Sequence, residues 1–242
     1  RLKGLEALIG VTVVNPRLTD QGWQFGGFPG ADEDPHHGAR YLHELYTRAD
    51  PEVSGRATVP VLWDTHTDTL VNNESADILR MLNGAFSHLV DRGPDLYPAH
   101  LAAEIDALNH VIYTELNNGV YQAGFASSQA AYEEAYGKVF ARLDALEARL
   151  GDGRAYLFGE ALTESDIRLF VTLVRFDAAY HGLFKCNRNP LAAMPALHAY
   201  LHRLLALEGI AETVNLEHIK AGYYSIRALS PTGIVPVGPA AL

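Results

Sequence analysis

The 242-residue sequence predicts a fold of two parts, a small α/β part over residues 1–84 and a larger all-helical part over residues 98–242. Short β-branched runs separated by turn-rich stretches fill the first part, and such runs are typical of strands. In the second part, apolar residues recur at spacings of three and four, which indicates amphipathic helices. Between the two parts, Asp91-Arg92-Gly93-Pro94 has the composition of a linker.

Three apolar runs predict strands in the first part: Val11–Val14, Thr58–Trp63 and Thr69–Val71. The turn between the second and third runs makes these two an antiparallel hairpin. Residues 16–57 are polar and rich in glycine, and a loop of this length inside a compact domain is usually functional. Within that loop, Tyr41–Arg48 has helical spacing.

Two long apolar stripes predict helices in the second part, one from Leu101 to Leu116 and one from Tyr132 to Leu150. Thr163-Glu164-Ser165-Asp166 is a capping-box pattern with a short acid in place of glutamate. It precedes the apolar run from Ile167 to Val174, so we expect a helix to begin there and Asp166 to serve as a cap, not as a catalytic acid.

Met194–Leu207 predicts a last long helix, which the chain enters through Pro195. The tail Ser230–Pro239 holds three prolines and two glycines. Because proline cannot continue a helix or a strand ladder, we expect this tail to lie extended on the surface.

Composition excludes several classes of partner. The formal net charge of −10 argues against a nucleic-acid-binding surface, because phosphate backbones are bound by clustered Lys and Arg. No apolar run approaches the roughly 20 residues that a membrane-spanning helix needs, so we expect no membrane partner. Cys186 is the single cysteine, so no disulfide can form within the chain. A lone cysteine suits a reducing compartment, and we expect a cytoplasmic protein.

The segment from Val59 to Ser75 has features that suit a peptide-like ligand. Pro60 within a strand fits a cis bond or a strand edge, and a cis bond would turn the backbone of Val59 outward to pair with an extended peptide. Glu74 and Ser75 open a predicted helix that runs to Leu82, where free amides attract a carboxylate. The simpler alternatives are that Ser75 is an ordinary N-cap and that Pro60 only marks an edge strand.

Seven stretches spread over nearly the whole chain form one set of motifs. They are GWQF around Trp23, FPGA at Phe28–Ala31, SGRATVPVLWD at Ser54–Asp64, NNESADILRM at Asn72–Met81, NNGVYQAGFA at Asn117–Ala126, FDAAYHGLFKCN at Phe176–Asn187 and HIKAGYYSIRALSPTGIVPVGP at His218–Pro239. This set resembles the glutathionyl-hydroquinone reductases, the Xi class of glutathione transferases. The resemblance implies the glutathione transferase fold, with a thioredoxin-like N-terminal domain and an all-α C-terminal domain.

The resemblance implies a thiol–disulfide reaction that reduces glutathionyl-hydroquinones to hydroquinones, with glutathione as co-substrate, no metal and a homodimer. Two other functions stay open. One is a generic glutathione transferase that conjugates electrophiles, and the other is a non-catalytic glutathione-binding protein of the same fold. They differ in the product that forms and in whether a nucleophilic cysteine exists.

The sequence departs from the family at its nucleophile. The family cysteine stands in a Cys-Pro-Trp-Ala stretch at the start of the first helix, where the helix dipole lowers its pKa. RLKGLEALIG at residues 1–10 resembles the end of that helix. We therefore expect the cysteine, the first strand and the start of the first helix to lie before Arg1, and the chain as given to be inactive.

Five residues match positions of the family that bind glutathione. Val59 would pair its backbone with the cysteinyl unit, and Glu74 and Ser75 would hold the γ-glutamyl end. Trp23 would line the site, and Arg56 would reach the glycine carboxylate. The alternatives are sheet pairing for Val59, a loop-pinning aromatic for Trp23 and a surface ion pair for Arg56.

Tyrosines match positions of the family near the hydroquinone oxygens. These are Tyr121 and one of the neighbouring pair Tyr223 and Tyr224. A phenol there would hydrogen-bond the oxygen or assist its protonation, and ordinary core packing is the alternative.

Three other polar residues that attract notice are expected to have no catalytic role. Cys186 follows no helix start that could stabilise a thiolate, so we interpret it as a buried small hydrophobe. His198 and His202 have the i, i+4 spacing that can hold zinc, but no acidic partner accompanies them. We therefore interpret the two histidines as part of a polar helix face and expect no metal site.

Overall fold

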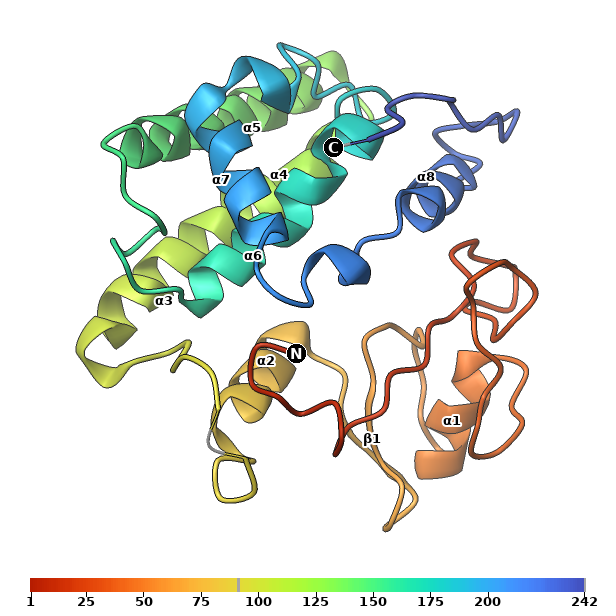
Figure 1. Cartoon of the computed structure of the whole chain (residues 1–242). Coiled ribbons are helices and arrows are strands. Elements are labelled where there is room, and N and C mark those ends of the chain that lie inside the picture. The colour runs from red at the N-terminus through yellow and green to blue at the C-terminus, as the bar shows by residue number, and fades with distance from the viewer. Residues whose placement is uncertain (91, 242) are drawn as a thin grey trace. The chain divides into compact units, whose positions relative to one another are not determined.

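The computed structural model describes residues 1–90 and 92–241, so Asp91 of the predicted linker lies outside the described residues. Two compact units divide the chain between Arg92 and Gly93. The first unit in sequence order spans Lys3–Arg92, and we call it the N-terminal unit. The second contains the residues from Gly93 onward together with Arg1–Leu2, and we call it the helical unit. Figure 1 shows the course of the chain through the elements of both.

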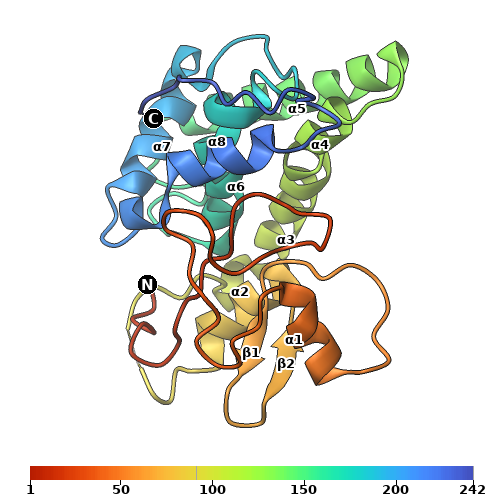
Figure 2. The same ribbon diagram turned by 90° about the vertical axis from the view of Figure 1, so that its right-hand side faces the viewer.

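The N-terminal unit is built on a two-stranded antiparallel sheet and two helices. Strands β1 (Leu62–Asp64) and β2 (Thr69–Asn72) lie side by side in Figure 2, with Trp63 opposite Leu70. Helix α1 (Leu42–Ala49) precedes the hairpin and α2 (Ser75–Gly84) follows it. The hairpin and both helices are therefore confirmed. The buried residues of this unit's small core are Phe25, Ala39, Leu42, Leu45 and Tyr46.

The predicted strand at Val11–Val14 is wrong. Asp32 occupies the hydrogen-bonding groups of this segment, since its amide donates to the Val13 carbonyl at 2.7 Å and its carboxylate accepts from the Val13 amide at 2.7 Å. The β-branched run is extended but has no neighbouring strand among the described residues. The predicted strand Thr58–Trp63 is also shorter than expected, because pairing begins at Leu62.

The long loop before α1 is held together by buried polar side chains. The Asn15 side chain donates to the Gly26 carbonyl at 3.0 Å. The Asp34 carboxylate accepts hydrogen bonds from three amides, including that of Ala39 at 2.9 Å. Burial raises the pKa of Asp34, but these three amide bonds outweigh burial, so its pKa is lowered. The loop is therefore an ordered part of the unit.

The helical unit is built from helices that bury one large apolar cluster. The predicted stripe from Leu101 to Leu116 divides into three consecutive helical elements, and the stripes of α5 and α6 are confirmed. The elements in order are η1 (Ala99–Leu101), α3 (Ala102–Val111), η2 (a π-helix, Ile112–Asn117), α4 (Gly119–Gly124), α5 (Gln129–Leu150), α6 (Glu164–Arg175), η3 (a π-helix, Phe176–Tyr180), η4 (Leu191–Ala193), α7 (Pro195–Leu205), η5 (Ala211–Thr213) and α8 (Leu216–Tyr224).

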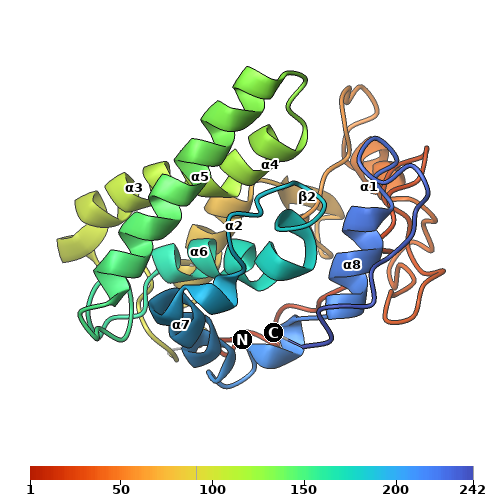
Figure 3. The ribbon, with the colours of Figure 1, turned by 90° about the horizontal axis from the view of Figure 1, so that it is seen from above.

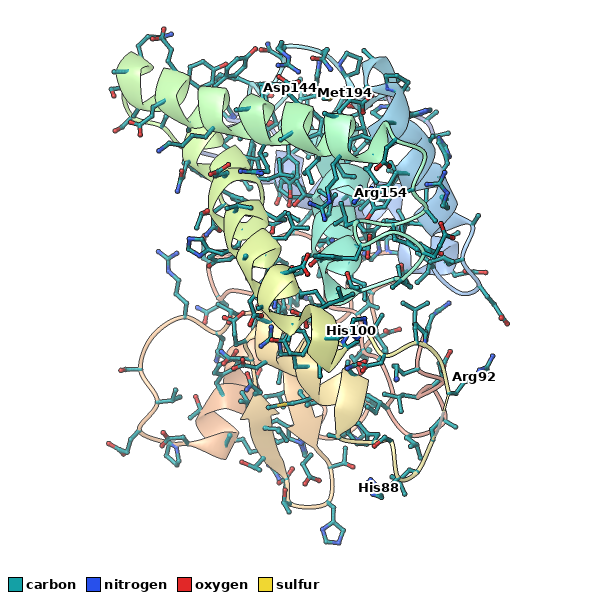
Figure 4. All side chains as sticks on the ribbon, turned by 90° about the vertical axis from the view of Figure 1, so that its left-hand side faces the viewer. His88, Arg92, His100, Asp144, Arg154 and Met194 are labelled. Carbon is teal, nitrogen blue, oxygen red and sulfur yellow. The ribbon has the colours of Figure 1, made fainter. Side chains whose placement is uncertain are left out.

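Helix α5 organises its neighbours through two acidic side chains. The Glu147 carboxylate accepts from the amides of Ala196 at 2.8 Å and Leu197 at 2.7 Å, so it caps the first turn of α7. One turn earlier, Asp144, labelled in Figure 4, accepts two hydrogen bonds from the Arg188 guanidinium. These contacts hold α7 and the segment before it against α5.

The predicted capping box at Thr163 is confirmed, and Asp166 does more than close the first turn of α6. Its carboxylate is fully buried and accepts from the Thr163 amide and hydroxyl, the Leu157 amide at 2.9 Å and the Tyr200 hydroxyl at 2.6 Å. Burial raises the pKa of Asp166, and these donors only partly offset that effect. Figure 3 shows α6 running beside α7, which carries Tyr200.

The tail after α8 has no regular structure, as expected from its prolines. The buried Lys220 ammonium on α8 donates to the Val237 carbonyl at 3.0 Å, which holds the end of the tail to that helix. No described helix is long and apolar enough to cross a membrane.

Replacing Asp166 by alanine should lower the free energy of unfolding by about 3 kcal/mol, because four buried donors lose their acceptor. Ser128→Ala removes the exposed N-cap of α5 and should cost about 1 kcal/mol. Urea unfolding followed by circular dichroism measures both. A loss for Asp166→Ala no larger than that for Ser128→Ala would contradict this role.

Candidate active site

The hydroxyl of Tyr46 connects three segments of the N-terminal unit. It donates to the Thr58 carbonyl at 2.8 Å and accepts from the Thr58 amide at 3.2 Å. It also accepts from the Asn73 side chain at 3.0 Å. The ring of Tyr46 is part of the buried core, so helix α1 positions both Thr58 and Asn73. We call Tyr46, Thr58 and Asn73 the Tyr46 cluster.

The residue after Thr58 offers free backbone groups. The Val59–Pro60 bond is cis, and Val59 is 40% exposed. Within the described residues, neither the amide nor the carbonyl of Val59 has a hydrogen-bond partner. The plain sheet pairing that was the alternative for Val59 does not occur here, since β1 begins at Leu62. This backbone can therefore pair with an extended ligand.

The residues after Asn73 open helix α2, and the N-cap is Glu74, not Ser75. The Asn72 side chain accepts from the Glu74 amide at 2.7 Å, and the Glu74 carboxylate accepts from the Ala76 amide at 3.2 Å. Ser75 is the first helical residue and is exposed. The exposed helix start thus presents a carboxylate, a hydroxyl and first-turn amides, which together suit a ligand that carries both an ammonium and a carboxylate group.

Trp23 and Arg56 belong to the same unit but differ in their packing. Trp23 is half-buried against the small core, and its carbonyl accepts from the Leu42 amide at 2.8 Å. It therefore pins the loop to α1, whatever else it contacts. Arg56 is exposed and has no ion pair with any described residue, so the surface ion pair considered for it is not present.

In the helical unit, three tyrosine hydroxyls form a connected chain. Tyr121 on α4 and Tyr223 on α8 lie 2.7 Å apart, oxygen to oxygen, and Tyr223 lies 2.6 Å from Tyr180 at the end of η3. We call these three residues the phenol chain. The structure thus brings Tyr223 to Tyr121. The Tyr224 hydroxyl has no hydrogen bond to them, and burial raises its pKa.

The phenol chain is supported by close aromatic packing. Phe184 packs edge-on against Tyr121 and Tyr223, with ring centroids 5.2 Å and 5.7 Å apart. A Cβ at Gly124 would lie 2.5 Å from the Phe184 ring, so only glycine allows this approach. Burial raises the pKa of both Tyr180 and Tyr223 well above the ordinary value, so these groups act as neutral phenols.

The single cysteine is no candidate for a reactive thiol. Cys186 is fully buried, and burial raises its pKa to about 12. Its Sγ lies 3.9 Å from the Phe184 carbonyl, which is a weak contact. His198 and His202 bring their Nε2 atoms within 3.2 Å of each other, but no group of three or more metal-ligating side chains is found in residues 1–90 and 92–241.

Family models match both parts of the chain. Residues 2–85 match the model of the N-terminal domain of glutathione S-transferase, and residues 129–203 match the model of its C-terminal domain.

Similar proteins of known name indicate which class of this superfamily the chain resembles. The chain is 51% identical to glutathionyl-hydroquinone reductase PcpF of Sphingobium chlorophenolicum, with 99% of this chain and 76% of that protein covered. It is 50% identical to glutathionyl-hydroquinone reductase YqjG of Escherichia coli (strain K12), with 99% and 73% covered. The chain belongs to the glutathionyl-hydroquinone reductases of the glutathione transferase superfamily. The fold class expected from the sequence is confirmed with it.

Solved structures agree with this membership. The chain superposes on the glutathione-bound structure of YqjG with a TM-score of 0.96 at 50% identity, covering 98% of this chain and 78% of that one. It superposes on glutathione transferase Xi 1 from Trametes versicolor with a TM-score of 0.96 at 47% identity, covering 100% and 86%. The chain therefore belongs to the Xi class of glutathione transferases.

Sequence reasoning on this Xi-class chain missed two residues of its candidate site, Tyr46 and Tyr180. Tyr46 stood in a short helical pattern and gave no sign of a contact with Thr58 or Asn73. Tyr180 lies within the FDAAYHGLFKCN motif, but no sequence periodicity relates it to Tyr121 or Tyr223. Both contacts are long-range in the sequence, so only the fold reveals them.

Tyr46→Phe should loosen the segment before Val59 while keeping the ring in the core. The Thr58 amide loses its acceptor, so its hydrogen exchange in the native state should become about ten-fold faster, which corresponds to one hydrogen bond of about 1.4 kcal/mol. Tyr113→Phe is the matched control, because Tyr113 is 53% exposed. Unchanged exchange at Thr58 would show that the Tyr46 hydroxyl does not hold this segment.

Proposed function

We propose that this protein reduces glutathionyl-hydroquinones to hydroquinones, using glutathione as the reductant. The observation that carries the proposal is the match, over 99% of the chain at 50–51% identity, to two proteins named glutathionyl-hydroquinone reductases. The geometry of each unit adds support, because one presents groups suited to glutathione and the other presents groups suited to a phenolic oxygen.

Glutathione recognition is assigned to the N-terminal unit. The free amide and carbonyl of Val59 pair with the cysteinyl backbone of the tripeptide. The Glu74 carboxylate binds the γ-glutamyl ammonium group, and the Ser75 hydroxyl with the first-turn amides of α2 binds the γ-glutamyl carboxylate. Trp23 lines this site, and Arg56, which has no ion pair within the described residues, is available for the glycine carboxylate.

The reaction proceeds as two thiol–disulfide steps. A cysteine thiolate attacks the sulfur of the adduct, the carbon–sulfur bond breaks, and the ring carbon takes up a proton to give free hydroquinone. The enzyme then carries a disulfide with glutathione. A second glutathione thiolate attacks this disulfide, which releases oxidised glutathione and regenerates the enzyme thiolate. In total, one adduct and one reduced glutathione become one hydroquinone and one oxidised glutathione.

The nucleophile is proposed to be a cysteine that precedes Arg1. Cys186 does not fit the task, because a buried thiol with a pKa of about 12 is almost wholly protonated at neutral pH. Low-pKa cysteines occur at helix N-termini or beside cations. Cys186 lies in the loop between η3 and η4, at no helix start, and burial raises its pKa more than the neighbouring Lys185 lowers it.

The hydroquinone is assigned to the phenol chain. Tyr121 is 40% exposed, so its hydroxyl can reach a ligand, whereas Tyr180 is buried. A neutral phenol can donate to a ring oxygen and stabilise charge that develops there as the bond to sulfur breaks. Of the two neighbouring tyrosines, we propose Tyr223 as Tyr121's partner in this role and leave Tyr224 to packing.

We further propose that the protein is a cytoplasmic homodimer without nucleic-acid or membrane partners. The net charge of −10 argues against a nucleic-acid partner, and the single cysteine suits a reducing compartment. The homodimer is proposed from the resemblance to glutathione transferases alone.

A product assay tests the proposed function. The complete gene product and the present chain are incubated in parallel with glutathionyl-menadiol and glutathione, and free menadiol and oxidised glutathione are followed by chromatography. We expect equal amounts of both products from the complete protein. Failure to release menadiol while glutathione still binds would favour a glutathione-binding protein, and a new conjugate with electrophiles would favour a generic transferase.

Cys186→Ala should leave turnover of glutathionyl-menadiol by the complete protein within about two-fold of the unchanged protein, because the thiol only packs in the core. The substitution should lower the free energy of unfolding by about 1 kcal/mol, because it removes one buried sulfur atom from the core. Steady-state kinetics and urea unfolding measure the two effects. If the variant stays folded but loses turnover, the prediction is contradicted and Cys186 takes part in the reaction.

A further inference from the structure

His198 and His202 form a close pair of imidazole rings on α7. His202 is exposed and His198 is half-buried. Their Nε2 atoms lie 3.2 Å apart, and the ring planes are inclined by 79°. The ring centroids are 4.5 Å apart, farther than the nitrogens, so the rings approach each other at their Nε2 ends. Residues four apart lie on the same face of a helix, which explains why the two side chains meet.

The fold holds α7, and with it the histidine pair, in a fixed position. The Tyr200 hydroxyl donates to the buried Asp166 carboxylate at 2.6 Å, and the Glu147 carboxylate caps the first turn of the helix. The carbonyl of His202 accepts from the Ala206 amide at 3.0 Å, so the last turn is formed as well. The two rings are therefore presented by a rigid element and not by a loop.

The short distance between the two nitrogens requires a positive centre near them. Two unprotonated Nε2 atoms at this distance would repel each other through their lone pairs. Either a proton on one nitrogen or a cation shared by both removes this repulsion. Because solvent reaches His202, a cation that binds imidazole can replace the proton, which is then released.

The separation of the nitrogens matches that of a metal chelate. Imidazole nitrogens bind divalent transition cations at about 2.1 Å. A cation at this distance from both Nε2 atoms would make a nitrogen–metal–nitrogen angle of about 100° for the observed 3.2 Å. This value lies between the angles of about 90° and about 109° in octahedral and tetrahedral complexes. The observed separation therefore suits a bound cation without change.

The ligand set selects the class of cation. Hard cations such as Ca²⁺ and Mg²⁺ take oxygen ligands, whereas imidazole suits copper, nickel and zinc. Zinc sites in proteins usually have three or four protein ligands, but no third His, Cys, Asp or Glu joins this pair within the described part of the chain. Cu²⁺ and Ni²⁺ fit better, because water can fill their remaining positions. The sequence led us to expect no metal site for want of an acidic partner, but these cations need none.

We propose that His198 and His202 form a chelating site for a divalent transition cation of the Cu²⁺ and Ni²⁺ class, which would link two consecutive turns of α7. The inference does not depend on the proposed function, since none of the residues assigned to glutathione or to the hydroquinone lies on α7.

A titration of the folded protein with Ni²⁺ tests the proposal. Ni²⁺ is the probe because it does not oxidise thiols, and its unpaired electrons broaden the resonances of nearby amides. Backbone ¹⁵N–¹H resonances are followed as Ni²⁺ is raised from micromolar to millimolar concentration in a buffer that does not chelate metals. We expect the amides of α7 around the two histidines to broaden first, along one saturating curve.

Two variants each remove one ligand. His198→Gln and His202→Gln should both weaken Ni²⁺ binding at α7 about ten-fold or more, because a chelate becomes a contact with a single ligand. Glutamine is a good helix former, so α7 should stay intact. His110→Gln is the matched control, since His110 is exposed on α3 and has Asp106 and Thr114, not histidines, four residues away. It should leave the broadening of α7 unchanged.

Two results would overturn the proposal. Broadening of α7 at the same Ni²⁺ concentration in either His198→Gln or His202→Gln would reveal a contact with one histidine in place of a chelate. Amides of α7 that stay sharp at millimolar Ni²⁺ would show that a proton alone joins the two rings. Resonances outside α7 that keep their positions in both variants show that the fold is retained, so a loss of broadening then reports the loss of the ligand.

Discussion

The arrangement of the candidate site in the N-terminal unit depends on the hydroxyl of Tyr46. Its ring is fixed in the small core, and its oxygen takes part in hydrogen bonds with Thr58 and Asn73. Val59 follows the first of these residues and Glu74 follows the second. One buried side chain therefore sets the position of an unpaired backbone segment and of a helix start, which are the two parts of the unit that suit a tripeptide ligand. Because the ring is held by packing, the two parts keep their spacing without a ligand.

The helical unit uses buried polar groups in a similar way. Asp166 collects four donors from three segments and has no exposed surface, so it orders the start of α6 relative to α7. The phenol chain also connects separate elements, but through neutral groups, since each hydroxyl is hydrogen-bonded to a hydroxyl on a different helical element. In a low-dielectric interior such networks are favourable only when every member is paired. That requirement gives Asp166 a purely structural role.

Local sequence patterns predicted the secondary-structure elements that depend on interactions between residues close in the sequence. The hairpin, the capping box at Thr163 and the stripe of α5 follow from turn chemistry, capping and periodicity, and all three are present. The strand at Val11–Val14 was wrong, because the aspartate at position 32 satisfies its backbone in place of a neighbouring strand. Glu74 replaces Ser75 as N-cap because Asn72 accepts from its amide and fixes the turn before the helix. The Tyr46 cluster and Tyr180 could not be predicted, since each links residues that no periodicity relates.

The most direct test of the account is an amide-resolved titration of this chain with glutathione. Backbone ¹⁵N–¹H resonances are followed as reduced glutathione is added to millimolar concentration, with methionine as a control ligand that carries an amino-acid group without the tripeptide backbone. The account requires the amides of Val59 and Ser75 to shift together along one saturating curve, with the exposed residue Glu208 unaffected. Shifts confined to other residues, or the same shifts with methionine, would contradict the assignment of glutathione to Val59 and the start of α2.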